Sequence, residues 1–108
     1  MNRSGNVYLK NVFCGMVSET DYGYMFAYDY NFVLTKDAQA VSVTLPVIEK
    51  PYQSKTLFPF FDGLIPEGWL LDIAEKNWKI NHKDRMGLLL TCCKDCIGAV
   101  SVQKNEEL

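Results

Sequence analysis

The sequence has little of the positive charge that nucleic-acid-binding proteins carry. Its formal net charge at pH 7 is -2, and its lysines and arginines are scattered singly along the chain. Affinity for nucleic acid depends largely on clustered cations that neutralise phosphates. Direct nucleic-acid binding is therefore not expected, and any contact with DNA would be made through a partner protein.

The sequence also lacks the motifs of phosphoryl-transfer enzymes: it contains no G-x-G-x-x-G, no G-x-x-x-x-G-K-[ST], no H-R-D and no D-F-G. Candidates for acid-base chemistry are poorly placed. Glu106 and Glu107 lie in a polar tail, and Asp72 with Glu75 lies on the polar face of a predicted helix. The single histidine, His82, has polar neighbours typical of a helix start. We predict that the chain is not an enzyme and carries no cofactor.

No apolar run approaches the length of a membrane-spanning helix, and residues 1–13 lack the apolar core and cleavage site of a signal peptide. The content of 48% hydrophobic and 22% charged residues is that of an ordinary globular protein. At 108 residues the chain has the size of one domain. We expect a cytoplasmic protein without membrane contact, forming a single domain over residues 1–108 that is ordered from about residue 6 to residue 103.

The cysteines permit two interpretations. Without a secretory signal, Cys14, Cys92, Cys93 and Cys96 are expected to be reduced thiols that pack as small hydrophobic residues. Structural zinc needs four converging ligands, so the C-C-x-x-C group would bind zinc only if Cys14 or His82 completed it. No metal site is predicted, and a small thiol or zinc-binding protein is kept as an alternative.

Alternating or aromatic-rich segments predict strands over residues 6–10, 12–19, 24–30, 40–45 and 97–102. Lys10 and Asn11 predict one tight connection, and the turn-rich residues 18–23 predict another. Residues 32–35 are expected to extend the chain briefly. Residues 49–56 are polar, contain a proline and show no apolar period, so they are expected to form an exposed, mobile loop.

Three helical pieces are predicted after these strands. They are a short turn over residues 57–61, a helix from Pro66 to about Trp78, and a helix from Asn81 or His82 to about Cys93. Several strands, then helices and a last strand indicate an α+β fold, with a small antiparallel sheet and helices packed on one side.

Three segments carry a more specific pattern: VSVTLPV at residues 41–47, LFPFFDGLIPEG at residues 57–68 and KDCIGAVSV at residues 94–102. In this order they resemble the N-terminal domain of HipA-type serine/threonine kinase toxins, with FFDxLxPEG and the GAV strand as the more specific parts. The resemblance covers about residues 7–102 and implies the fold of that domain. The chain departs from the family pattern at Trp69, and at Cys96, where a serine often precedes the GAV strand.

A free-standing copy of this domain resembles the small antitoxin of tripartite HipBST toxin–antitoxin systems. The resemblance implies that the chain binds and inhibits a HipT-like kinase toxin, while a HipB-like helix-turn-helix protein in the same complex binds DNA. Proline and glycine fix the backbone of the LIPEG turn, and tryptophan offers a large apolar anchor, so we expect this corner to face the active site of the kinase. The predicted partner-binding residues are Asp62, Gly63, Pro66, Glu67, Gly68 and Trp69.

Two further alternatives stay open. Tryptophan is highly buried on average, so Trp69 could instead be a residue at the boundary of the core. The chain could also be a structural subunit that completes a truncated kinase without inhibiting it.

Overall fold

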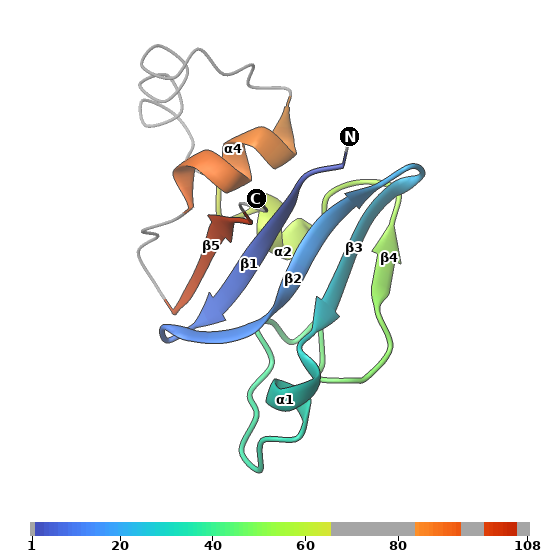
Figure 1. Cartoon of the computed structure of the whole chain (residues 1–108). Coiled ribbons are helices and arrows are strands. Elements are labelled where there is room, and N and C mark those ends of the chain that lie inside the picture. The colour runs from blue at the N-terminus through green and yellow to red at the C-terminus, as the bar shows by residue number, and fades with distance from the viewer. Residues whose placement is uncertain (1, 66–83, 94–98, 106–108) are drawn as a thin grey trace.

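The computed structural model describes residues 2–65, 84–93 and 99–105 (Figure 1). Its centre is a five-stranded antiparallel sheet with the order β4-β3-β2-β1-β5. The strands are β1 (Ser4–Leu9), β2 (Val12–Thr20), β3 (Gly23–Tyr28), β4 (Tyr52–Ser54) and β5 (Val100–Lys104). The described helices are α1 (Tyr30–Val33), α2 (Pro59–Asp62) and α4 (Arg85–Cys92). The predicted α+β class is confirmed.

Two hairpins build the first three strands. Between β1 and β2, Lys10 and Asn11 have φ angles of 51° and 67°. This left-handed pair is the geometry of a two-residue type I′ turn, whose twist matches that of the flanking strands. The hairpin from β2 to β3 closes at the pair Thr20 and Gly23. Both connections lie where the sequence predicts them.

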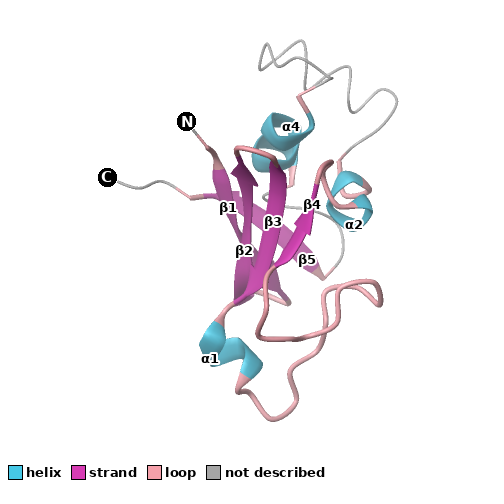
Figure 2. Cartoon of the chain, turned by 90° about the vertical axis from the view of Figure 1, so that its right-hand side faces the viewer, coloured by secondary structure: helices cyan, strands magenta, loops and turns pink. Residues whose placement is uncertain are grey.

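One face of the sheet carries the core. Val7, Val17, Phe26 and Val102 come from four strands and are fully buried on this face. Helix α4 packs on it beside β5, and α2 lies next to α4 (Figure 2). Helices α2 and α4 therefore cover one side of the sheet, as predicted, and α1 lies at one end of it (Figure 1). None of the helices in the described ranges is long and apolar enough to cross a membrane.

Residues 40–45 do not form the predicted strand, and the structure has only an isolated bridge there, between Ser42 and Leu45. The Tyr28 hydroxyl accepts a hydrogen bond from the Val41 N–H at 3.1 Å and donates one to the Leu45 carbonyl. The Val41 N–H and the Leu45 carbonyl, which would pair with a neighbouring strand in a sheet, are thus hydrogen-bonded to the Tyr28 side chain. The alternating pattern arises because Val41 and Leu45 are buried on either side of Val43, which is 94% exposed.

The prediction of a loop over residues 49–56 is also wrong in part, because the segment contains β4. Tyr24 pairs with Ser54 and Phe26 with Tyr52, which places β4 at the edge of the sheet. An edge strand of three residues does not need alternating apolar residues, so its sequence pattern resembles that of a loop. Gly23 makes the pairing possible, since its φ is 154° and a Cβ there would collide with the Ser54 carbonyl.

The remaining differences concern the ends of elements. Residues 32–35 do not extend the chain, because Tyr30–Val33 is the short helix α1. The predicted turn over residues 57–61 is α2, which starts at Pro59 because the fixed φ of proline suits a first helical residue. Strand β5 is Val100–Lys104 and ends later than predicted, while residues 97 and 98 of the predicted strand lie outside the described residues. The predicted helix over residues 66–78 lies outside the described residues.

We predict that Tyr28→Phe loosens residues 41–45. The change keeps the ring, which stacks on Phe32 at a centroid distance of 5.9 Å, but removes the hydroxyl that binds Val41 and Leu45. The free energy of unfolding, measured by urea denaturation, should fall by about 1–3 kcal/mol because buried polar groups lose their partner. Amide exchange at Val41 should become faster.

The control for this substitution is Tyr22→Phe, at a tyrosine that is 92% exposed. It should change the free energy of unfolding by less than about 0.5 kcal/mol. Unchanged exchange at Val41 in Tyr28→Phe would show that the hydroxyl does not hold this segment.

Candidate partner-binding site

The predicted partner-binding residues fall into two groups. Asp62 is the last residue of α2, and Gly63 follows as its C-cap. The other four, residues 66–69, lie outside the described residues. The structure therefore describes how the first group is held and which contacts it makes.

Aromatic packing fixes α2 to the sheet. Phe61 is fully buried, and its ring centroid lies 5.1 Å from that of Phe26 on β3. The rings of Phe58 and Phe60 meet Phe61 edge-on at 6.2 Å and 5.2 Å. Such ring pairs stabilise beyond the area that they bury. Asp62, the next residue along the chain, is therefore presented from a rigid base.

Asp62 is paired with a cation from the next described helix. The Nε of Arg85 donates to Asp62 Oδ1 at 2.6 Å, and the two side chains are 32% and 42% exposed. A second bond joins the same parts of the chain, because the Cys93 thiol donates to the Leu64 carbonyl at 3.2 Å. Residues 62–64 are thus held at both the start and the end of α4. A partner would meet an ion pair here, not a bare carboxylate.

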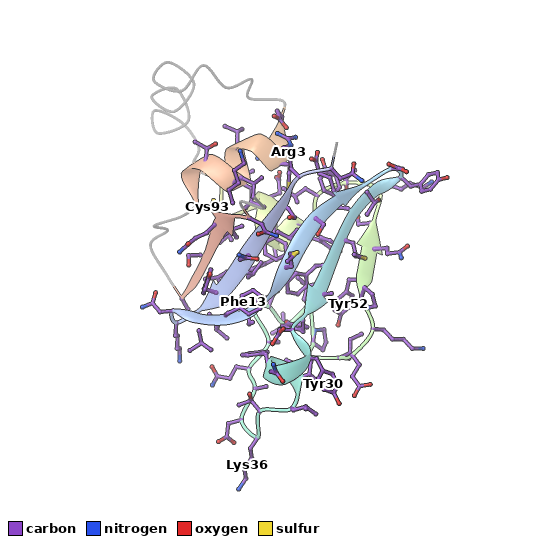
Figure 3. The ribbon with its side chains drawn as sticks, in the orientation of Figure 1. Arg3, Phe13, Tyr30, Lys36, Tyr52 and Cys93 are labelled. Atoms are coloured by element: carbon purple, nitrogen blue, oxygen red, sulfur yellow. The ribbon has the colours of Figure 1, made fainter. Side chains whose placement is uncertain are left out.

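A second ionic cluster, formed by Arg3, Glu19 and Asp84, ties the start of α4 to the sheet. Figure 3 labels Arg3, which lies near the start of α4. Arg3 binds Glu19 through Nε at 2.8 Å and Nη2 at 3.0 Å, and it binds Asp84 through Nη1 at 2.9 Å and Nη2 at 2.8 Å. The planar guanidinium favours such two-point pairing. Hydrogen bonds from Arg3 hold the pKa of both carboxylates below their usual values.

Asp84 is also the N-cap of α4, since its Oδ1 accepts a hydrogen bond from the Gly87 N–H at 3.2 Å. A Cβ at Gly87 would collide with the Asp84 carboxylate and lie 3.1 Å from Arg3 Nη1, so glycine leaves room for the cluster. The sequence did not predict this cluster. An aspartate before an apolar run is a helix-start signal, but Arg3 lies 81 residues away and gives no local sign of its role.

No group of three or more His, Cys, Asp or Glu side chains that could hold a metal ion occurs within residues 2–65, 84–93 and 99–105. Cys14 and Cys93 are both buried. Burial, with a smaller contribution from Asp29, raises the pKa of Cys14 to about 12, so this thiol stays protonated at neutral pH. The zinc alternative depends also on Cys92, Cys96 and His82, whose side chains lie outside the description.

The sequence matches the model of the HipA N-terminal domain over residues 5–103. The chain belongs to the HipA N-terminal domain family. A solved structure titled "N-terminal domain of HipA toxin" superposes with a TM-score of 0.75 at 30% sequence identity, covering 98% of this chain and 95% of that chain. The fold that the three sequence segments imply is therefore confirmed.

A second similar protein is an uncharacterised protein of Haemophilus influenzae. It is 32% identical over 105 residues, which are 97% of this chain and 95% of that protein. The similarity therefore extends over nearly the whole length of both proteins.

We predict that acid weakens the Arg3 cluster. The pKa values of Glu19 and Asp84 lie below 4.5 and 3.8, their ordinary values, in the folded protein. As the pH falls, the two carboxylates therefore take up protons in the unfolded chain before they do so in the folded protein. The cluster stabilises the fold fully at pH values above the ordinary pKa values, and this stabilisation is lost as the pH falls through the lower pKa values of the folded state. The free energy of unfolding should begin to decrease at about pH 5.

The variant Arg3→Gln tests this assignment by urea denaturation at several pH values. It should lower stability at pH 7 by only about 1 kcal/mol, because the charges are partly exposed to solvent, and it should flatten the loss below about pH 5. Lys36→Gln removes a cation from an exposed residue and should keep the wild-type profile. An equally steep loss in Arg3→Gln would place the acid-sensitive groups elsewhere.

Proposed function

We propose that this protein is a HipS-type antitoxin of a HipBST system, which binds a HipA-like serine/threonine kinase toxin, HipT, and inhibits it. The observation that carries the proposal is the match of nearly the whole chain to the N-terminal domain of HipA toxin. An antitoxin with the fold of this domain is suited to bind where the domain would sit on the kinase. The relative in Haemophilus influenzae supports this view, because the domain makes up nearly all of that protein.

Two features of the chain support a binding role. Phe61, the Asp62–Arg85 ion pair and the buried Ile65 fix the end of α2, and a rigid surface loses little entropy on binding. The net charge of -2 supports a division of labour in which a HipB-like helix-turn-helix protein binds the DNA. From the sequence pattern of the LIPEG turn and Trp69, we propose that residues 66–69, which follow Ile65, meet the active site of the kinase.

The test is a phosphorylation assay with a HipT-like kinase as the proposed partner. Phosphorylation of the kinase's substrate should fall as this protein is added and should be fully suppressed at a stoichiometric amount. Growth of cells that express the kinase should recover in parallel. A complex that forms but leaves phosphorylation unchanged or faster would instead identify a structural subunit.

We predict that Trp69→Ala releases the kinase from inhibition. Loss of a central aromatic anchor costs about 2 kcal/mol or more of binding free energy, which is a decrease of about 30-fold in affinity. Calorimetric titration of an inactive kinase should show this loss, while circular dichroism should show an intact fold.

Tyr22→Ala is the matched control, because it removes an aromatic ring that is 92% exposed at the β2–β3 hairpin. It should bind and inhibit like the wild type. Full inhibition by Trp69→Ala would remove the tryptophan from the mechanism and would leave the antitoxin proposal standing.

A further inference from the structure

The sheet has a second face, which we call the open face, and none of the described helices covers it (Figures 1 and 2). Apolar residues run across its centre. Register pairs Met16 with Ala27 and Tyr8 with Phe13, and the last two rings meet edge-on at 5.8 Å. Met25 continues the row on β3. Phe13 is 38% exposed, so this apolar row reaches solvent.

The open face carries no charged side chain across the described strands. Around the apolar row stand only small or amide-bearing polar residues, among them Ser4, Asn6, Ser18, Gln53, Ser101 and Gln103. Charged residues form 22% of the chain, so their absence here departs from its overall composition. The centres of protein interfaces are depleted in charge and enriched in tyrosine, phenylalanine and methionine, with a polar rim.

The size of the open face indicates what covers it. Strands about 4.8 Å apart and about six residues long give this five-stranded sheet a face of about 450 Å². Covering this face alone would bury about 900 Å² counted over both partners, less than the roughly 1,200–2,000 Å² of a stable interface between separate proteins. The kinase contact proposed at residues 66–69 would add to that area, whereas a second copy that meets only this face would not. The similar solved structure is, by its title, one domain of a toxin.

We propose that the open face docks on the body of the HipT-like kinase, as a second contact in addition to residues 66–69. The inference rests on the proposed function and extends it to a surface that the partner-binding residues do not include. A charge-free surface binds an apolar, equally charge-free patch, because a charge buried against it would lose its hydration without gaining a partner.

Oxidation of methionine by hydrogen peroxide tests this contact in the wild-type protein. Met16 and Met25 lie on the open face, whereas Met86 is fully buried in α4. Binding of the inactive kinase should slow oxidation of Met16 and Met25 about fivefold or more, since the reaction follows exposure. Met86 should stay unreactive in the free protein and in the complex, which reports an intact core.

Two lysine variants test the same face by calorimetric titration. Met25→Lys places a charge at its centre, and Phe13→Lys places one where the native side chain is 38% exposed and folding is least at risk. Each should weaken kinase affinity about tenfold or more. Tyr22→Lys adds the same charge at the hairpin and should stay within about twofold of the wild type. Circular dichroism checks the fold of each variant.

The outcomes separate this inference from the proposed function. If the wild-type protein does not bind the kinase, both fail. If it binds while Met16 and Met25 stay reactive and the lysine variants bind normally, the open face is not the contact and the antitoxin proposal remains. If light scattering shows a dimer that Phe13→Lys dissociates without changing kinase affinity, a second copy covers the face and the inference is overturned.

Discussion

The packing of Phe61 against Phe26 is the contact on which the rest of the structure depends. Helix α2 has four residues, too few to be stable alone, so its helical form is a consequence of its aromatic residues entering the core. Once Phe61 is buried, Asp62 has a fixed place beside α4 and can pair with Arg85. The Asp62–Arg85 ion pair thus depends on the position that the packing of Phe61 gives to Asp62.

The two ionic contacts of α4 fix the position of this helix more than they add to the stability of the fold. Arg3 and Asp84 are each more than a third exposed, and pairs of this kind contribute little free energy in water. Their geometry is nevertheless specific, because one guanidinium joins β1, β2 and the N-cap of an eight-residue helix that would be marginal alone. The chain is therefore fixed on both sides of residues 66–83, at Ile65 by burial and at Asp84 by charge.

The first three strands could be predicted because their signals are local: alternation, aromatic residues and turn chemistry at Lys10 and Asn11. Residues 40–45 show equally good alternation but are no strand, because the Tyr28 hydroxyl takes their backbone groups. Strand β4 carries no signal, since its pairing at the sheet edge depends on a glycine about thirty residues earlier, Gly23. For the candidate site, the sequence pointed to Asp62 and Gly63 but gave no sign of Arg3 or Arg85.

A domain that binds as a separate protein meets its partner without a covalent linker. A covalent linker gives a domain an effective concentration in the millimolar range, about a thousandfold above that of a separate protein at micromolar concentration, and this ratio corresponds to about 4 kcal/mol. A free-standing copy lacks this contribution and has to replace it with direct contacts. One aromatic anchor supplies about 2–4 kcal/mol, so a corner around Trp69 would at best restore what the linker provided. A second surface would then add to the affinity. The open face, which is uncharged and lies on rigid paired strands, can provide it without any change to the core on the other side of the sheet.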